Sequence, residues 1–343
     1  MEALVKYDKG QGNVRLQDMP DPKVEKGKVV LEVNSCGVCG TDLHVYHDTF
    51  KNYPPVILGH EFSGRVVEKG PNTEGIDLGG RFSVLGALTV VCNDCEYCHS
   101  GDFMFCRARR GMGHGVNGAF TKYVVARPDQ LYATAAHVSD DVSALVEPFA
   151  VAVRAVGEIA NVQFGDTVLL SGPGPIGMLL LKLLLAQGLK TIVAGTREDE
   201  HKLKTALEWG AHATVMVDVE DLQEVIQQET KGKGVDIAFE TAGAQGSVAN
   251  CLTALRPLGQ YVQVGHFGKE ITIPFDLTAF RQLNIKGSVG YTRATWDRAV
   301  EIINQGNINL EDTISHRMPL SDWQKGFDLM EQKKSLKILL YPS

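Results

Sequence analysis

Residues 167–177 read TVLLSGPGPIG, and this stretch decides the fold of the second half of the chain. Five residues of strand character are followed by glycines in G-x-G-x-x-G spacing and then by an apolar run of helical length. Glycines at this spacing form a tight turn and let a helix N-terminus approach a pyrophosphate. The stretch therefore predicts a dinucleotide-binding turn rather than an ordinary strand–helix turn. The expected contact residues are Gly172, Gly174, Pro175, Ile176 and Gly177.

From about residue 151, strand-like and helical stretches alternate along the chain. The strand-like runs are residues 167–171, 191–194, 214–217, 236–240, 261–264 and 284–288. Such alternation predicts an α/β fold with a doubly wound parallel sheet of six strands.

The stretches on either side of this segment have another character. Short β-branched runs separated by glycine and proline predict a β-rich, irregular domain in residues 1–150. After Gly290 the chain is helical over residues 296–305 and 320–332 and closes with an apolar strand at 336–341. We expect this tail to return to the first domain. The predicted domains are residues 1–150 with 288–343, and residues 151–287.

The end of the second predicted strand bears on cofactor choice. An NAD enzyme usually places an acid there, about 20 residues beyond the glycines, to bind the ribose 2′-hydroxyl. This chain has Thr196 and Arg197 instead, and Glu198 comes slightly late. With Lys202, these residues predict that NADP(H) is favoured over NAD(H); the alternative is that Arg197 faces solvent and Glu198 holds the ribose. Further expected cofactor contacts are Val264, Gly265 and Val289.

Six of the seven cysteines lie between Cys36 and Cys106. Four of them, in the loop 92–106, have the spacing C-x2-C-x2-C-x7-C, namely Cys92, Cys95, Cys98 and Cys106. Four thiolate ligands that leave no coordination position open are typical of a structural zinc site. Iron–sulfur clusters use related spacings, so spacing alone leaves that alternative open.

A second set of potential ligands is dispersed in the sequence. Cys39 lies in SCGVCGTDLH, His60 and Glu61 in LGHEFSG, and Glu147 in VEPFA. Each is a weak signal alone, but together they supply one soft, one borderline and two hard donors. That mixture suits a second zinc ion with an exchangeable position.

Composition limits the class of protein. A chain of 343 residues is long for one hydrophobic core, which favours two domains. The net charge of −7 gives no support for nucleic-acid binding. The longest apolar run, residues 176–186, is interrupted by Lys182 and is too short to span a bilayer. No signal-peptide pattern is visible at the N-terminus, so we expect a cytoplasmic protein with reduced thiols.

Taken together, GVCGTDLH, LGHEFSG, the four-cysteine loop, GAFTKYVV, VEPFA and GPGPIG resemble the zinc-containing medium-chain dehydrogenases over essentially the full length. The resemblance implies a GroES-like catalytic domain interrupted by a Rossmann domain. It also implies a homodimer or homotetramer, and the oxidation of a small-molecule alcohol or the reduction of its ketone.

The resemblance assigns roles to the dispersed ligands. Cys39 and His60 match the first two ligands of the catalytic zinc. Glu61 and Glu147 match acidic positions that bind this metal directly or through water in polyol dehydrogenases. Cys36 matches no ligand and is expected in the core.

Two further positions match the proton pathway of the family. Thr41 matches the hydroxyl beside the substrate alcohol, and His44 the end of the proton relay to solvent. In such enzymes zinc polarises the alcohol oxygen while hydride passes to the nicotinamide.

Within the family, polyol and polyol-phosphate dehydrogenases are favoured over L-threonine dehydrogenases. The latter carry a histidine shortly before the cysteine loop, where this chain has Ala87. Tyr46 and Tyr291 are candidates for lining a polyol pocket, and Arg293 for meeting a phosphate. An NADPH-binding sensor is a non-enzymatic alternative, but it would have no need for Cys39, His60 and Thr41 together.

Overall fold

The computed structural model describes residues 1–342 and divides into two compact units. The first unit comprises Met1–Ala150 and Tyr291–Ser343, and the second comprises Val151–Gly290. The boundaries between the predicted catalytic and dinucleotide-binding domains, after residues 150 and 287, stay predictions. Among the described residues, no helix is long and apolar enough to cross a membrane.

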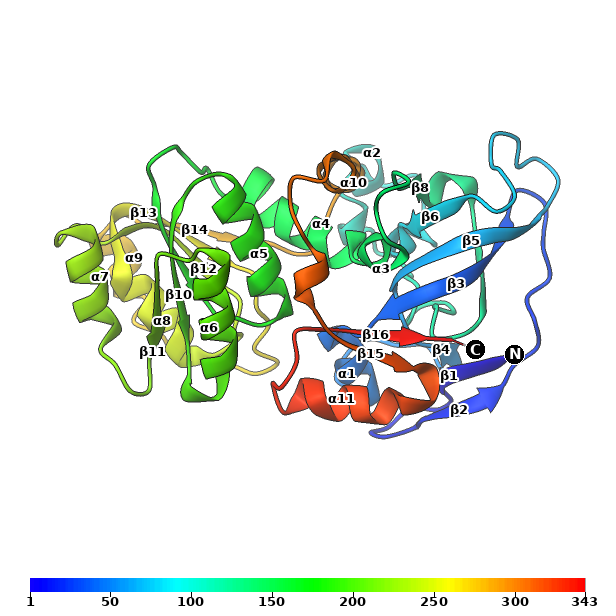
Figure 1. Ribbon diagram of the computed structural model, residues 1–343, viewed down its shortest axis with the longest axis horizontal. Helices are drawn as coiled ribbons and strands as arrows, with labels where there is room; N and C mark the ends of the chain where they lie inside the picture. Colours follow the sequence, from blue (N-terminus) through cyan, green and yellow to red (C-terminus); the bar gives the residue numbers. More distant parts are fainter. Residues whose placement is uncertain (343) are drawn as a thin grey trace. The chain divides into compact units, whose positions relative to one another are not determined.

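The second unit is built on a six-stranded parallel sheet with the order β11-β10-β9-β12-β13-β14 (Figure 1). The chain starts in the middle of the sheet at β9, moves outward to β11, and then crosses back to β12. This reversal confirms the predicted doubly wound fold. The strands are β9 (Thr167–Ser171), β10 (Lys190–Gly195), β11 (Ala213–Met216), β12 (Val235–Glu240), β13 (Leu255–Gln263) and β14 (Asn284–Gly287).

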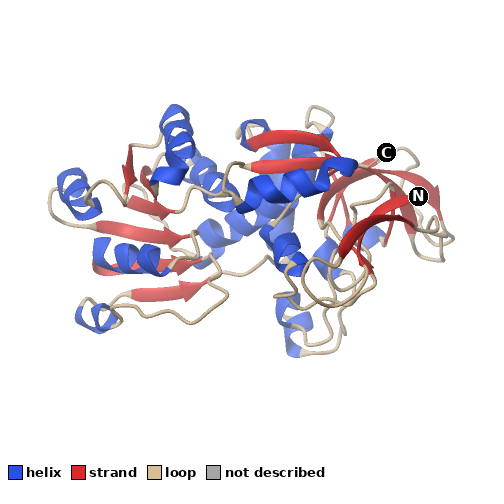
Figure 2. Ribbon diagram, turned by 90° about the horizontal axis from the view of Figure 1, so that it is seen from below, coloured by secondary structure: helices blue, strands red, loops and turns tan. Residues whose placement is uncertain are grey.

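Helices lie on both sides of this sheet (Figure 2). The first of them, α5, follows the glycine-rich turn and buries seven apolar or glycine residues. A strand that is covered on both faces has a nearly continuous apolar sequence, because the side chains on both faces are buried. This explains the sequence TVLLS of β9. The helices are α5 (Pro175–Ala186), α6 (Glu200–Trp209), α7 (Leu222–Thr230), α8 (Gln245–Ala254) and α9 (Asp276–Phe280), with a short η5 (Arg197–Asp199).

The first unit is β-rich, as its short β-branched runs predicted. A seven-stranded sheet has the order β15-β16-β3-β5-β6-β8 with β7 also on β3, and a smaller sheet has the order β2-β1-β4. The strands are β1 (Glu2–Lys6), β2 (Val14–Asp18), β3 (Val29–Gly37), β4 (Val56–Ile57), β5 (Glu61–Lys69), β6 (Arg81–Val84), β7 (Tyr123–Ala126), β8 (Leu131–Ala133), β15 (Ile314–Pro319) and β16 (Lys337–Tyr341). The helices are α1 (Gly40–Tyr46), α2 (Glu96–His99), α3 (Asp140–Ala144), α10 (Arg293–Gln305) and α11 (Trp323–Glu331). Helix α4 (Val146–Arg154) begins in this unit and continues into the second at Val151.

The C-terminal strand pairs with a strand from the N-terminal half of the chain. Strand β16 pairs antiparallel with β3, so that Leu340 lies opposite Cys36 (Figure 1). Cys36 is fully buried in the same core cluster as Leu340, which confirms that it is a core residue. Segments from both ends of the sequence thus form one hydrophobic core.

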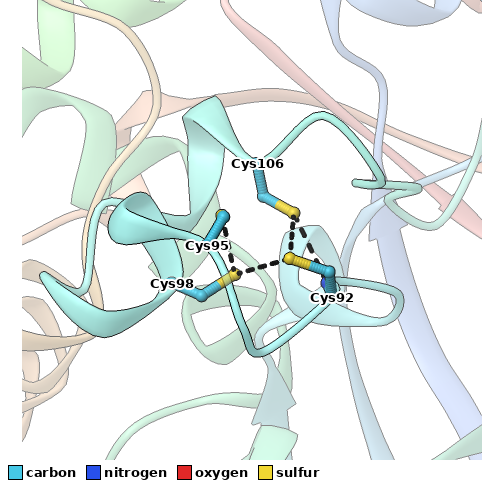
Figure 3. A group of neighbouring side chains, drawn as sticks. All are labelled: Cys92, Cys95, Cys98 and Cys106. Carbon is cyan, nitrogen blue, oxygen red and sulfur yellow. Dashed lines mark hydrogen bonds between the residues drawn. The ribbon is translucent and has the colours of Figure 1, made fainter.

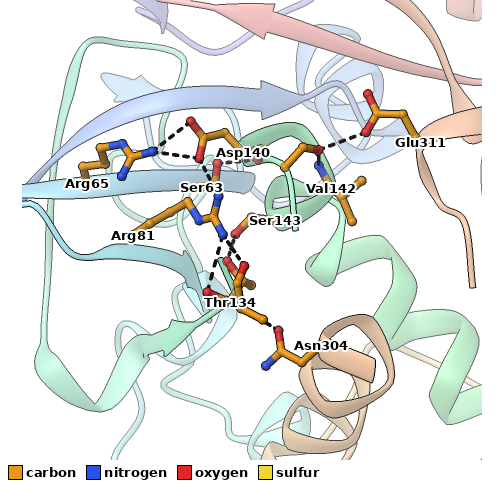
Figure 4. Close-up of polar contacts among 11 residues, drawn as sticks. Ser63, Arg65, Arg81, Thr134, Asp140, Val142, Ser143, Asn304 and Glu311 are labelled. Atoms are coloured by element: carbon orange, nitrogen blue, oxygen red, sulfur yellow. Dashed lines mark hydrogen bonds and ion pairs between the residues drawn. The ribbon is translucent and has the colours of Figure 1, made fainter. Parts of the chain in front are cut away.

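A network of hydrogen bonds and ion pairs connects α3 to the seven-stranded sheet (Figure 4). The Asp140 carboxylate accepts hydrogen bonds from Arg65 on β5 at 3.3 Å and from Arg81 on β6 at 3.1 Å. Close by, Asn304 on α10 accepts a hydrogen bond from the backbone of Ala135 at 2.8 Å. The network therefore ties the late helix α10 to a loop from the first half of the chain.

Candidate functional site

Strand pairing assembles the first group of potential metal ligands. Gly37, at the end of β3, lies opposite Glu61, the first residue of β5. Cys39 follows β3 and His60 precedes β5, so the two side chains emerge at the same end of the sheet. The ligand atoms of Cys39, His60 and Glu61 all lie within 4.8 Å of one another. The fourth predicted ligand, Glu147, is not part of this group.

Asp42, which the sequence analysis did not single out, holds this arrangement in place. It is buried, and its carboxylate accepts hydrogen bonds from the backbone N–H of Cys39 at 2.9 Å and of Gly59 at 3.3 Å. Its Oδ1 also lies 3.6 Å from His60 Nδ1. One carboxylate therefore positions both the thiol and the imidazole. Asp42 is the third residue of α1 and forms a capping box with Cys39, although Cys-x-x-Asp lacks the serine or threonine of the usual capping-box sequence.

Glu61 has a second partner that sequence reasoning missed. Its Oε2 forms an ion pair with Lys337 Nζ from β16, and both side chains are only 1% exposed. Lys337 also donates to the Val38 carbonyl at 3.1 Å. There is no space for a Cβ at Gly37, because the Glu61 carboxylate fills it. A single lysine in the apolar strand KILLY was the only sequence signal for this pair.

Glu147 lies nearby on α4 with a different partner. Its Oε1 accepts a hydrogen bond from the Tyr291 hydroxyl at 2.8 Å, and Tyr291 is 1% exposed. Burial raises the pKa of Glu147 to about 7; the charge of Glu61 adds to the shift, whereas that of His60 opposes it. Glu147 is thus within electrostatic reach of the group without belonging to it.

The donor atoms fit a metal ion. Among the described residues, His60 Nδ1 and Glu61 Oε1 are buried and have no hydrogen-bond partner. Burial lowers the pKa of His60, but the charges of Asp42 and Cys39 outweigh this and hold it well above its usual range. The group therefore favours an added positive charge. A thiolate, an imidazole and a carboxylate together match the ligand preferences of zinc.

The two residues of the expected proton pathway lie on α1. Thr41 is half-buried, two positions after Cys39. His44 is exposed one helical turn further on, and its Nδ1 lies 3.0 Å from Thr49 Oγ1. Positions three apart share one face of a helix. The helix thus carries one group beside the thiolate and another in contact with solvent.

The four loop cysteines converge on one point (Figure 3). The Sγ atoms of Cys92 and Cys98 are 3.9 Å apart, and those of Cys95 and Cys98 are 3.6 Å apart. Cys106 Sγ lies 3.6 Å from Cys92 Sγ. Four sulfurs placed 2.3 Å from a tetrahedral zinc ion are about 3.8 Å apart. The spacing therefore fits a single four-coordinate ion, and all four thiols are free of disulfide bonds.

The glycine-rich turn in the second unit has the features of an anion site. Gly172 has φ +106°, and a Cβ there would lie 2.5 Å from the Ala242 nitrogen. A Cβ at Gly177 would lie 2.0 Å from the Gly172 carbonyl oxygen, so only glycine fits there. By contrast, a Cβ at Gly174 would meet no protein atom within 4 Å, so the bare backbone faces open space. Because α5 begins here, its first N–H groups remain available to a phosphate.

The residues expected at the cofactor ribose have partners within the second unit. Lys202 is buried, and its Nζ lies 3.1 Å from Asp199 Oδ1. Thr196 donates to the other oxygen of Asp199, also at 3.1 Å. Arg197 is exposed, and its backbone N–H binds Asp218. Among the remaining expected contacts, Val264 is buried, Gly265 is half-buried and Val289 is exposed.

The residues suggested for a substrate pocket have varied surroundings. Tyr46 packs at 6.0 Å, ring to ring, against Phe327. Arg293 forms an ion pair with Asp129 at 2.7 Å, so the prediction that it meets a phosphate is not supported. Tyr291 alone contacts a predicted site residue, Glu147.

Two family models match the chain. The model described as alcohol dehydrogenase GroES-like domain matches residues 25–136, and the model described as zinc-binding dehydrogenase matches residues 175–305. Together they cover much of the first unit and most of the second.

Curated relatives match over nearly their full length. A sorbitol dehydrogenase from Halalkalibacterium halodurans is 34% identical over 100% of this chain and 99% of its own. A D-arabitol-phosphate dehydrogenase from Enterococcus avium is 33% identical over 99% and 97%. An L-threonine 3-dehydrogenase from Alteromonas mediterranea is 30% identical over 99% of both.

The solved structures agree. A protein from Sinorhizobium meliloti 1021, described as a "putative zinc-binding dehydrogenase" and bound to NADP, superposes with a TM-score of 0.89 at 28% identity, covering 99% of both chains. Relatives that are more than 30% identical over nearly the full length establish the family of this chain. The chain belongs to the zinc-containing medium-chain dehydrogenases and is an NAD(P)-linked alcohol dehydrogenase of that family.

Proposed function

We propose that the enzyme interconverts a secondary alcohol, either a polyol or a polyol phosphate, and its ketone. The observation that carries the proposal is the group of Cys39, His60 and Glu61. Among the described residues, two of its ligand atoms, His60 Nδ1 and Glu61 Oε1, are buried without a hydrogen-bond partner. The full-length similarity to a sorbitol and a D-arabitol-phosphate dehydrogenase supports the substrate class.

In the proposed reaction the bound zinc and nicotinamide have one set of roles and the side chains of the enzyme have another. When bound at Cys39, His60 and Glu61, zinc supplies a Lewis acid for the alcohol oxygen, and the nicotinamide supplies a hydride acceptor. The Thr41 hydroxyl takes up the alcohol proton as it gives up its own, and His44, at the other end of the relay, passes a proton to solvent. Asp42 keeps the thiolate and imidazole oriented throughout. Glu147 supplies a second carboxylate close to the reacting alcohol.

A second zinc ion, in this proposal, is structural. The thiolates of Cys92, Cys95, Cys98 and Cys106 hold it with no open position, so it stabilises the loop and takes no part in the reaction. Metal analysis tests this: two zinc ions per chain are expected, and one after Cys95→Ser. A finding of iron in place of zinc would contradict the assignment.

The proposed cofactor is NADP(H) in preference to NAD(H). Arg197 is exposed at the end of β10, where it can meet a 2′-phosphate, and the Asp199 carboxylate is engaged by Lys202. The NADP-bound structural relative supports the choice. Arg197→Ala is expected to reduce kcat/KM for NADPH about 10-fold and to leave that for NADH unchanged. An equal or higher kcat/KM with NAD in the unaltered enzyme would contradict the preference.

We also propose a cytoplasmic homodimer or homotetramer. Seven cysteines without disulfides fit a reducing compartment. All four residues of the sheet-edge strand β14 are exposed, and nearby Phe280 is 83% exposed. An uncovered edge with apolar neighbours is a surface that association would bury.

The deciding experiment is a panel of polyols, polyol phosphates and L-threonine, assayed with both cofactors. Turnover of a polyol or its phosphate is expected, and it should disappear in Cys39→Ser while NADPH binding persists. Preferential turnover of L-threonine would support the alternative substrate class. Unchanged turnover in Cys39→Ser would refute the metal mechanism.

A further inference from the structure

Lys337 is a charged residue in an otherwise apolar strand. It is the first residue of β16, whose sequence is KILLY, and its side chain is 1% exposed. A lysine is rarely buried to this degree unless its ammonium group has an acidic partner. That partner is Glu61, one of the three residues whose ligand atoms could hold a metal ion.

Strand pairing places Lys337 beside the metal-binding group. Strand β16 runs antiparallel to β3, and the Val38 N–H donates to the Ile338 carbonyl at 2.9 Å. Continued by one residue, this register brings Lys337 level with Cys39. Hydrogen bonds from its ammonium group to the Val38 carbonyl and to the Glu61 carboxylate then fix the side chain.

The two oxygens of the Glu61 carboxylate differ in their surroundings. Oε2 forms the ion pair with Lys337 and lies against the bare backbone of Gly37, where a Cβ would overlap it. Oε1 is buried and has no hydrogen-bond partner among the described residues. The lysine therefore occupies one oxygen and leaves the other to a metal ion held with Cys39 and His60.

Stability alone is a weak explanation for this ion pair. The cost of taking both charges out of water offsets most of their attraction, and apolar residues of similar volume are often at least as stable. The lysine does, however, change how strongly Glu61 binds a cation. It takes up one oxygen and part of the negative charge, and its own positive charge opposes a second cation nearby.

We propose that Lys337 is a positioning residue that keeps Glu61 a weak metal ligand, bound through one oxygen. Because Glu61 then holds the ion only loosely, its coordination position stays open to exchange with a substrate oxygen. The inference deepens the proposed function and rests on it, since such exchange matters only if an alcohol is oxidised beside Cys39 and His60.

Zinc affinity tests the proposal without any turnover. In Lys337→Met the carboxylate regains both oxygens and its full charge. The Kd for zinc, measured by competition with the chelator dipicolinate, should therefore fall about 10- to 100-fold. Release from the four loop cysteines is measured in Cys39→Ser and subtracted. A lysine with only a structural role predicts the opposite result, a weaker zinc site, and that result or an unchanged Kd would overturn the proposal.

A matched control removes the same charge elsewhere in the sheet. Lys122 lies 3.9 Å from Glu32 on β3, and both side chains are exposed to solvent. Because water screens such a pair, Lys122→Met should leave the Kd for zinc unchanged. Lys337→Arg, which keeps the positive charge beside Glu61, should retain a Kd close to that of the unaltered enzyme.

The number of ligands gives a second readout. Sites of this kind can expand from four ligands to five, and with cobalt in place of zinc this expansion weakens the visible absorption bands. After subtraction of the Cys39→Ser spectrum, the cobalt bands of Lys337→Met should be weaker than those of the unaltered enzyme. Bands of equal strength would show that Glu61 gains no second contact with the metal.

Two further variants identify the carboxylate as the responsible group. Adding Glu61→Gln to Lys337→Met should abolish the gain in zinc affinity. A gain that persisted would show that the lysine acts by its charge alone, and the positioning role would be overturned. Gly37→Ala, whose Cβ displaces Oε2 without changing any charge, should give a smaller gain and keeps the proposal testable if Lys337→Met does not fold.

Kinetic measurements separate this inference from the proposed function. In Lys337→Met the KM for the oxidised alcohol should rise about 10-fold, in parallel with the tighter binding of Glu61 to zinc, while the Kd for NADPH stays the same. If no alcohol in the panel is oxidised, the proposed function fails, and the zinc and cobalt measurements still decide the role of Lys337. Oxidation of a polyol together with unchanged or weaker zinc binding in Lys337→Met would leave the proposed function standing and overturn the inference.

Discussion

At the scale of single residues, the ion pair between Glu61 and Lys337 has consequences for stability. Replacing Lys337 with methionine leaves a buried carboxylate without its countercharge, which typically costs about 3–5 kcal/mol. We therefore expect the free energy of unfolding of the metal-free protein to fall by that amount in Lys337→Met, measured by urea denaturation. Adding Glu61→Gln should restore a large part of the loss.

The control for this prediction is a half-exposed pair. Lys190 and Glu229 are 2.9 Å apart with side chains 30% and 29% exposed. Lys190→Met should cost no more than about 1 kcal/mol, because solvent screens such pairs. Equal losses in the two lysine variants would show that the pair at Glu61 is not desolvated.

A second residue, His114, predicts a pH dependence. Its pKa is lowered from 6.5 to about 3 by burial and by the charges of His60 and Arg109. Below pH 6.5 the unfolded chain takes up a proton that the folded protein does not, so the free energy of unfolding decreases as the pH falls toward 3. In His114→Gln this contribution is absent. Between pH 7 and 5, the free energy of unfolding measured by urea denaturation should therefore decrease less steeply in His114→Gln than in the unaltered protein. Identical slopes of this free energy against pH would contradict the lowered pKa of His114.

At the scale of elements, the turn between β9 and α5 offers a matched pair of substitutions. Gly172→Ala forces a Cβ against Ala242 at a positive φ, so it should lower the melting temperature and weaken NADPH binding. Gly174→Ala meets no protein atom, so the melting temperature should be unchanged while the Kd for NADPH rises. Calorimetric melting and fluorescence titration measure the two effects. Unchanged NADPH binding in Gly174→Ala would place the pyrophosphate elsewhere.

Most elements could be predicted because apolar runs in the second unit are bounded by glycines. Strand β9 matched its prediction residue for residue, whereas β13 begins at Leu255, six residues early, and passes through a register shift against β12. A turn-like Pro257 concealed that start. Strand β15 was not predicted, because its polar residues alternate irregularly between buried and exposed positions.

The candidate site was predictable to the extent that it follows from local motifs. The four loop cysteines are marked by their spacing, and Cys39 and His60 by the family motifs in which they lie. The role of Lys337 depends on the pairing of β16 with β3, which no local pattern specifies. The partner of Lys202 could not be predicted, because the sequence gives charge but not burial, and the structure turns this side chain toward Asp199.

At the scale of the whole molecule, the edge of the second unit predicts how copies associate. Ile285 lies on β14, the last strand of the sheet, and is 37% exposed. If the proposed oligomer forms there, Ile285→Lys should shift the mass measured by light scattering toward the monomer. Val219→Lys, at another exposed apolar position of the same unit, is the control. A mass unaffected by Ile285→Lys would place the interface elsewhere.

The pairing of Lys337 with Glu61 also bears on synthesis. The two residues are 276 positions apart, and a nascent chain leaves the ribosome N-terminal end first. Every cysteine and histidine of the metal group is therefore translated long before the lysine that neutralises its carboxylate. The pocket reaches its final charge only once β16 has been synthesised and has paired with β3, so we expect zinc to be acquired in its native geometry only after that strand has formed.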